Sequence, residues 1–78
     1  MPTVFRSGPY RFFFFSADRG EPVHVHVARD ACHAKFWVDP PRLDSSTGFG
    51  RKELGILESL VSQQADMLRR AWNDHFTD

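Results

Sequence analysis

Two runs of alternating residues, separated by only three positions, restrict the fold of this chain most strongly. Valines at positions 23, 25 and 27 alternate with His24 and His26, and the run "CHAKFWV" at 32–38 keeps the same period of two. This period is typical of β-strands, in which successive side chains point to opposite faces of a sheet. The intervening "RDA" is too short for a crossover connection, so strands at about 23–28 and 32–38 must form an antiparallel hairpin.

The hairpin brings the polar residues of both strands to one face. If the tight turn is Arg29-Asp30, His26 lies opposite His33 and His24 lies opposite Lys35. A four-residue turn changes these partners but keeps the two faces, whereas a bulge or an odd-numbered loop does not. We therefore predict an apolar face that carries the valines and a polar face that carries His24, His26, His33, Lys35 and Trp37.

The segments before the hairpin read as two further strands. "TVFR" at 3–6 is short and is followed by Ser, Gly and Pro, which punctuate regular structure. "YRFFFFS" at 10–16 is rich in aromatic residues, as strands are. Because its phenylalanines point to both faces, this strand is expected to be covered on both sides.

The second half of the chain has a helical period. Apolar residues recur every three or four positions over about 51–76, with a break near 62–64 as an alternative. The segment 39–50 is rich in Pro, Gly and Ser and is predicted to be a connector. The predicted fold class is α+β: one domain over 1–78, with a small antiparallel sheet of three to four strands followed by a C-terminal helix or helix pair packed on one face.

Composition excludes several classes of protein. The ten basic and ten acidic residues cancel, so there is no strongly basic footprint for nucleic acid. The single cysteine excludes an internal disulfide and fits a reducing cytoplasm. No signal peptide and no apolar run of about 20 residues is present, so we expect no membrane span. Eight Phe, two Trp and one Tyr are many rings for 78 residues, which suggests partly exposed aromatic surface and an association partner.

The predicted polar face admits three interpretations. His24, His26 and His33 could ligate zinc, but the ammonium group of Lys35 would repel the ion, so neither a metal nor another cofactor is expected. Alternatively, His24 and His26 act as catalytic bases near pH 7 and Lys35 stabilises a developing phosphate charge, as in RNA cleavage. In the simplest interpretation these residues are the polar side of a half-buried strand. His33 and Trp37 also suit a face that binds a partner or ligand.

A weaker candidate lies at the predicted start of the helix. Arg51 and Lys52 stand beside backbone N–H groups, an arrangement that can bind an anion. Residues of this type more often point into solvent, and Glu53 in the same turn partly offsets their charge.

Four stretches of the sequence resemble a family of small bacterial proteins, the domain-of-unknown-function family 4160. They are "MPTVFR", "YRFFFFS" with "EP" and "HVHV" after it, "AKFWV" with "GF", "EL" and "LV" after it, and "AWN". His24, His26, Lys35 and Trp37 lie on these motifs, whereas His33 does not clearly do so. The resemblance supplies no established catalytic residues. It implies a stand-alone cytoplasmic protein, often encoded beside a second small protein in an arrangement similar to toxin–antitoxin modules.

We therefore expect a small cytoplasmic bacterial protein of the toxin–antitoxin or stress-module type that acts with a cognate partner. Ribonuclease activity through the His-x-His strand is the enzymatic form of this hypothesis. A non-catalytic module that binds protein or nucleic acid and a metal-binding protein are the alternatives. A homodimer and RNA binding both remain open.

Overall fold

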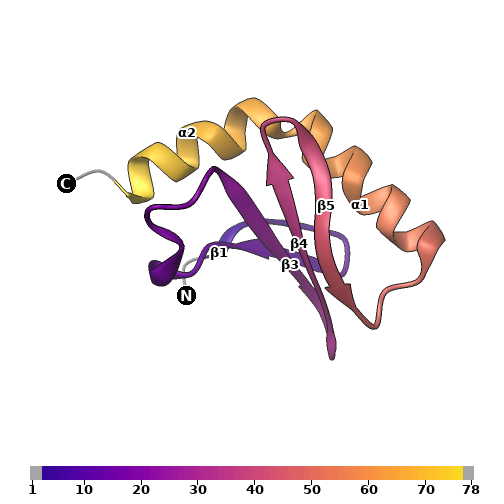
Figure 1. Cartoon of the computed structure of the whole chain (residues 1–78). Coiled ribbons are helices and arrows are strands. Elements are labelled where there is room, and N and C mark those ends of the chain that lie inside the picture. Colours follow the sequence, from indigo (N-terminus) through magenta and orange to yellow (C-terminus); the bar gives the residue numbers. More distant parts are fainter. Residues whose placement is uncertain (1–2, 77–78) are drawn as a thin grey trace.

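The computed structural model describes residues 3–76, which form a five-stranded antiparallel sheet followed by two helices (Figure 1). The strands lie side by side in chain order. Their bounds are β1 Thr3–Ser7, β2 Tyr10–Phe13, β3 His24–Arg29, β4 Cys32–Val38 and β5 Pro41–Thr47; a short 3₁₀ turn, η1, spans Ser16–Asp18, and the helices are α1 Arg51–Gln63 and α2 Ala65–His75. The predicted α+β class and the helix pair are confirmed, but the sheet has five strands instead of three or four.

The additional strand is β5, which lies inside the segment 39–50 that was predicted to be a connector. Its sequence, PRLDSST, lacks the apolar alternation of a buried strand, and nearly all of it is exposed. It forms a strand because it pairs with β4, so that Leu43 lies opposite Phe36 and Arg42 lies opposite Trp37. This pairing satisfies backbone groups whatever the local propensity of the side chains. Gly48 then ends β5 with a φ of 89°, where a Cβ atom would lie 2.9 Å from Cys32 Sγ.

The β3–β4 hairpin turns at Asp30-Ala31 and not at Arg29-Asp30. Asp30 has a φ of 53°, the left-handed conformation that Asp tolerates and that two-residue hairpin turns require. The predicted cross-strand partners are therefore wrong by two positions, since His24 lies opposite Trp37 and His26 opposite Lys35. The shift is even, so the two faces stay as predicted.

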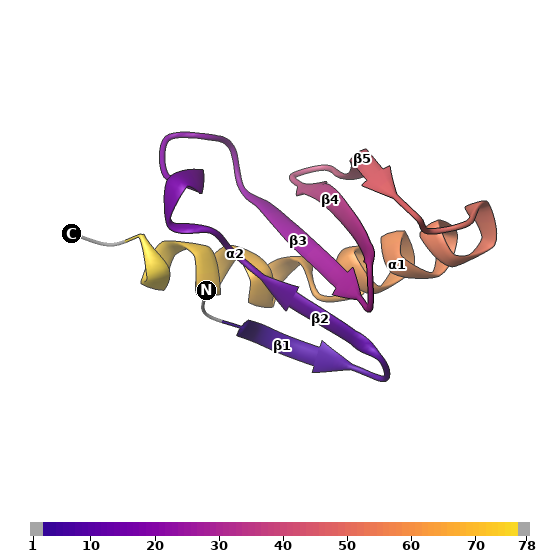
Figure 2. The same cartoon turned by 90° about the horizontal axis from the view of Figure 1, so that it is seen from below.

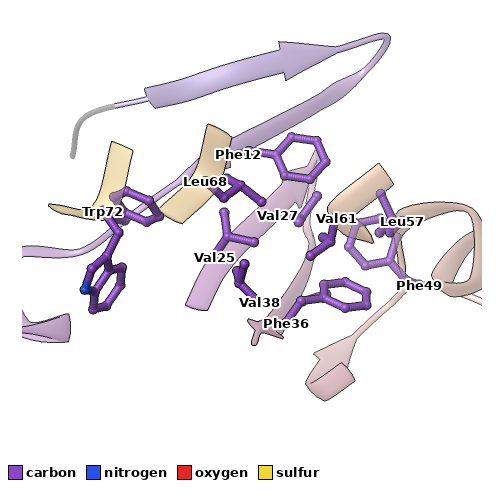
Figure 3. Close-up of a cluster of buried hydrophobic side chains, with 12 residues drawn as sticks. Phe12, Val25, Val27, Phe36, Val38, Phe49, Leu57, Val61, Leu68 and Trp72 are labelled. Carbon is purple, nitrogen blue, oxygen red and sulfur yellow. The ribbon is translucent and has the colours of Figure 1, made fainter. Parts of the chain in front are cut away.

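Both helices cover the same face of the sheet, as the view turned by 90° shows (Figure 2). The core between the two layers is apolar and fully or almost fully buried (Figure 3). It contains Phe12, Phe14, Val25, Val27, Ala34, Phe36, Val38, Phe49, Leu57, Val61, Leu68 and Trp72. In residues 3–76, no helix is long and apolar enough to cross a membrane.

Strand β2 ends at Phe13, three residues earlier than predicted. Phe14 leaves the sheet and packs edge-on against Trp72 of α2, with ring centroids 5.2 Å apart. The chain then forms η1 and returns to the sheet at His24. Packing against α2 therefore ends the strand, and the residues after Phe14, including Asp18, then cross to the face that the helices leave uncovered.

Candidate functional site

The face of the sheet opposite the helices carries the predicted polar residues, although the His24 ring also lies 5.0 Å from that of Trp72 in α2, and these residues differ in exposure. His24 is completely buried and His26 is only 7% exposed. Lys35 and Trp37, on the neighbouring strand, are partly exposed. We call the part of this face over β2 and β3 the histidine side, and the part over β4 and β5 the outer side.

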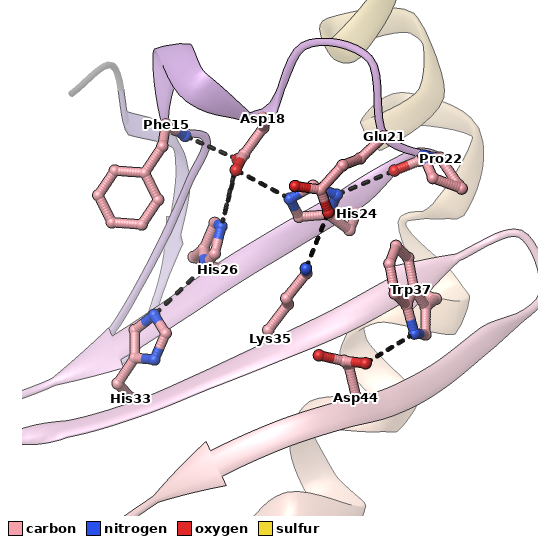
Figure 4. Close-up of polar contacts among 10 residues, drawn as sticks. All are labelled: Phe15, Asp18, Glu21, Pro22, His24, His26, His33, Lys35, Trp37 and Asp44. Carbon is pink, nitrogen blue, oxygen red and sulfur yellow. Dashed lines mark hydrogen bonds and ion pairs between the residues drawn. The ribbon is translucent and has the colours of Figure 1, made fainter.

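Asp18 of η1 is the centre of the histidine side (Figure 4). Its Oδ1 atom lies 3.1 Å from Nε2 of His24, and its Oδ2 atom lies 3.2 Å from Nε2 of His26. The backbone N–H of Phe15 donates to Oδ2 at 2.9 Å and orients the carboxylate. Asp18 itself is only 6% exposed. One buried carboxylate thus faces both imidazoles of the His-x-His pair.

Asp18 was not among the residues predicted from the sequence. It lies in a loop, eight positions before His26 in the chain, and no periodic pattern connects the two residues. The available signal was a carboxylate in the turn that precedes a strand with two histidines. That pattern identifies a contact between Asp18 and the histidines only when the path of the loop is known.

The Nδ1 atoms of the two histidines, on the other side of each ring, both have hydrogen-bond partners. Nδ1 of His24 lies 2.9 Å from the backbone oxygen of Pro22, and Nδ1 of His26 lies 3.2 Å from Nε2 of His33. His33, which was predicted to lie on a partner or ligand face and was considered as a third zinc ligand, therefore joins the site from β4. Phe13 stacks on His26 with ring centroids 5.5 Å apart and closes the site from β2.

Burial and charge act in opposite directions on the acid and base of this site. Burial alone would raise the pKa of Asp18, but the Phe15 N–H and the neighbouring histidines outweigh it and lower the pKa below its usual value. Burial lowers the pKa of His26, and this effect exceeds the opposing attraction of Asp18. Near neutral pH the site consequently holds a carboxylate and a neutral His26.

Lys35 does not join the two histidines, with which it was grouped as a catalytic candidate. Its Nζ atom donates to Glu21 Oε1 at 3.0 Å and lies 4.6 Å from the centroid of the Trp37 ring. The Trp37 Nε1–H in turn donates to Asp44 Oδ1 at 3.2 Å. The outer side is thus a row of partly exposed, paired polar groups that ends at β5.

Arg51 and Lys52 are exposed at the start of α1, and their predicted role in anion binding stays a prediction. Glu53 in the same turn does form a defined contact, because it accepts two hydrogen bonds from Arg29, at 2.8 and 2.9 Å, and one from Tyr10 at 2.7 Å. The bonds from Arg29 and Tyr10 lower the pKa of Glu53, while the bond to Glu53 raises the pKa of Tyr10. This contact links β2 and β3 to α1 and suggests a structural role.

The chemistry open to the histidine side follows from its burial. Two imidazoles and a carboxylate can move a proton or ligate a cation. A general base must reach within hydrogen-bonding distance of the group that it deprotonates. In this conformation an RNA hydroxyl cannot reach His24, which is completely buried. The arrangement therefore supports ligation or structural pairing by His24 better than RNA cleavage.

Comparison with known proteins gives one match. The family model described as "Domain of unknown function (DUF4160)" matches residues 10–73, which include β2 to β5, α1 and most of α2. No curated protein and no solved structure matches the chain. The family match covers every residue of the histidine side and the outer side. Because the match spans most of the sequence, this chain belongs to the DUF4160 family.

Proposed function

We propose that this chain is a small cytoplasmic bacterial protein of the toxin–antitoxin or stress-module type, and that it acts by binding a cognate partner protein along β5. The observation that carries the proposal is the exposure of β5, in which six of the seven residues are exposed. The histidine side, by contrast, is closed to macromolecules.

Strand β5 is suited to strand addition by a partner. It is the last strand of the sheet, and within residues 3–76 no further strand lies beyond it. An edge strand presents unpaired N–H and C=O groups that can pair with another chain. The opposite edge is less available, because β1 is shorter and three of its five residues are partly buried.

The side chains around β5 add specificity to such a contact. Leu43 is 37% exposed and offers an apolar anchor. Trp37 lies opposite Arg42 in the β4–β5 register, and Lys35 lies beside it over the indole ring. Aromatic and Arg side chains are enriched at protein interfaces, and a strand added to β5 would meet Leu43 on one face of the sheet and Trp37 with Arg42 on the other.

Binding is favoured over catalysis because of the burial of His24. The ribonuclease form of the hypothesis requires RNA to reach this ring, which is 0% exposed. Partner binding requires only residues that are already at the surface. The balanced charge also favours a protein partner over nucleic acid, since ten basic and ten acidic residues give no net attraction for phosphate.

The test is a binding titration of the full chain with the small protein encoded by the adjacent gene. We expect a one-to-one complex, which Leu43→Lys weakens at least about 10-fold because a desolvated charge replaces the apolar anchor. Thr3→Lys, which adds the same charge to the β1 edge, is the matched control and should bind like the wild type. Circular dichroism checks that both variants fold.

Three outcomes would contradict the proposal. The first is the absence of binding to the adjacent gene product. The second is equal weakening by Leu43→Lys and Thr3→Lys, which would remove β5 from the interface. The third is RNA cleavage by the isolated wild type that is lost in His26→Ala with the fold retained, which would return the histidine side to catalysis.

A further inference from the structure

The histidine side contains a buried nitrogen whose surroundings do not fit a metal-free hydrogen-bond network when the imidazole ring is neutral. Nδ1 of His24 lies 2.9 Å from the carbonyl oxygen of Pro22, which can only accept a hydrogen bond. Nδ1 must therefore carry the proton, and in a neutral ring Nε2 then holds a lone pair. Within residues 3–76, Nε2 of His24 has no hydrogen-bond partner, although its ring is completely buried.

The nearest polar atom makes this arrangement unfavourable. Oδ1 of Asp18 lies 3.1 Å from Nε2 of His24, close enough for a strong electrostatic interaction. The two atoms are not aligned as a hydrogen bond. A nitrogen lone pair and a carboxylate oxygen at this distance repel each other. Buried polar atoms without a partner are costly, so a positive species between these two atoms would resolve the conflict: a proton on Nε2, which is not aligned for a hydrogen bond here, or a metal cation.

We propose that Asp18, His24 and His26 bind one divalent transition-metal ion of the zinc type. One ligand atom from each residue lies within 4.8 Å of the other two. The distances from one carboxylate oxygen, Oδ1 of Asp18, to Nε2 of His24 and of His26 are 3.1 and 3.4 Å. Ligands bound tetrahedrally to zinc at about 2.0–2.1 Å are separated by about 3.3 Å, so the residues need to move little to enclose an ion.

The contacts around the three ligands are those of a metal site. The Nδ1 atom of each histidine, which faces away from the carboxylate, is held in turn by Pro22 and His33. The Phe15 N–H holds one oxygen of Asp18. Ligating histidines typically use the second ring nitrogen in this way, which fixes the ring and the tautomer.

The position of Lys35 reduces the repulsion that its ammonium group would exert on a bound cation. The ammonium group is paired with Glu21 at 3.0 Å and lies over Trp37, so its charge is largely compensated. An unpaired Lys35 beside the histidines, as predicted from the sequence, would repel a cation. Glu21, from the same loop as Asp18, removes most of that repulsion.

The ligand set selects the class of ion. Two imidazole nitrogens and one carboxylate oxygen suit zinc and neighbouring divalent transition metals, whereas calcium and magnesium prefer oxygen ligands. Three protein ligands leave at least one coordination position for water or another ligand. Both Asp18 and His26 retain 9% side-chain exposure, which leaves a narrow approach for such a ligand.

The test uses the untagged full chain, stripped with a chelator and titrated with Zn²⁺ and, separately, with Co²⁺. We expect one ion per chain, cobalt absorption bands of a nitrogen–oxygen site, and a rise in melting temperature on the order of 10 °C at about 100 times the dissociation constant. Magnesium should give no such rise at the same concentration. Absence of stoichiometric binding, or an equal response to magnesium, would overturn the proposal.

Variants assign the ligands. In His24→Asn the amide nitrogen can still donate to the carbonyl oxygen of Pro22, but the ligand atom Nε2 is lost. In Asp18→Asn the amide oxygen can still accept from the Phe15 N–H, but the negative charge is lost. Both should weaken binding by about 100-fold or more, while His33→Ala should weaken it by about 10–100-fold and keep one ion per chain. His75→Asn, a change at an exposed histidine outside the cluster, is the matched control and should bind normally. Normal binding by His24→Asn, or loss in His75→Asn, would contradict the assignment.

A measurement on the wild type covers the case in which a variant does not fold. Nitrogen NMR of the histidine rings should show His24 protonated at Nδ1, with the Nε2 signals of His24 and His26 shifted on addition of Zn²⁺. Unchanged ring signals in the zinc-saturated protein would overturn the site.

Discussion

The histidine side and the outer side belong to one face of one sheet, yet they differ in almost every physical respect. Over β2 and β3, the loop 14–23 covers the face, and Phe13, His24 and His26 are buried. Over β4 and β5 the face is only partly covered, and Lys35 and Trp37 pair with Glu21 and Asp44 near solvent. The polar groups of the histidine side are therefore expected to affect stability and ligation, and those of the outer side to affect recognition.

The difference between the two sides depends on where the loop returns and not on residue type. Both sides carry aromatic and ionisable residues from alternate positions of neighbouring strands. The loop gives each side a carboxylate, but Asp18 on the histidine side is buried, whereas Glu21 on the outer side is exposed. The following predictions test this contrast in order of decreasing effect.

The largest effect is expected from Phe13→Ala. Phe13 is 2% exposed and packs against His26 and Phe15, so truncation leaves a cavity under the site. We expect the free energy of unfolding to fall by about 3–5 kcal/mol in urea denaturation. Trp37→Ala on the outer side is the comparison and should cost about 1–2 kcal/mol, because the ring is only partly buried. Equal costs would mean that the two sides are equally buried in solution.

The second prediction concerns Asp18→Ala in metal-free buffer. The substitution leaves the Phe15 N–H and the Nε2 atom of His26 without their partner. We expect a loss of about 1–3 kcal/mol in the free energy of unfolding. Asp18→Asn keeps an acceptor and should lose less than about 1 kcal/mol. A negligible effect of Asp18→Ala would show that the loop does not close the histidine side in solution.

The third prediction tests whether burial or the number of polar contacts decides how much a carboxylate contributes to stability. Glu53 accepts three hydrogen bonds but lies at a partly exposed edge, with 24% of its side chain exposed. Its pKa is lowered from 4.5, mainly by Arg29, so the folded state favours the carboxylate. The unfolded chain therefore binds the proton first, and the stabilisation is complete above about pH 4.5 and is lost as pH falls through the lower folded pKa.

Thermal unfolding of wild type and Glu53→Gln between pH 7 and pH 3 measures this effect. The wild type should melt at the higher temperature at pH 7, and the difference should shrink as the pH falls below about 4.5. A difference that does not depend on pH would mean that the Arg29–Glu53 contact does not form in solution.

The smallest effect is expected from Lys35→Gln. Lys35 and Glu21 have 19% and 46% of their side chains exposed, so solvent and salt screen the ion pair. We expect a change of less than about 1 kcal/mol in the free energy of unfolding, and a smaller change in high salt. A loss as large as that of Asp18→Ala would show that Lys35 belongs to the buried network.

Local periodicity determined much of this protein from its sequence. The alternation in 23–27 and 32–38 predicted the β3–β4 hairpin and its two faces, and the helical spacing after residue 51 predicted the helices. Membership of His24, His26 and His33 in one cluster also followed, because side chains on alternate positions of paired strands must share a face. Such patterns depend only on the geometry of regular structure, so they can be read from residues close together in the chain.

Only the tertiary structure decided the features that give the two sides their different properties. Strand β5 forms because β4 offers backbone partners, and the sequence PRLDSST carries little intrinsic sign of a strand. Asp18 meets the histidines because Phe14 packs against Trp72, a residue 58 positions later in the chain, and thereby turns the loop over the sheet. Contacts between distant segments have no local period, so the position of this carboxylate could not be read from the sequence.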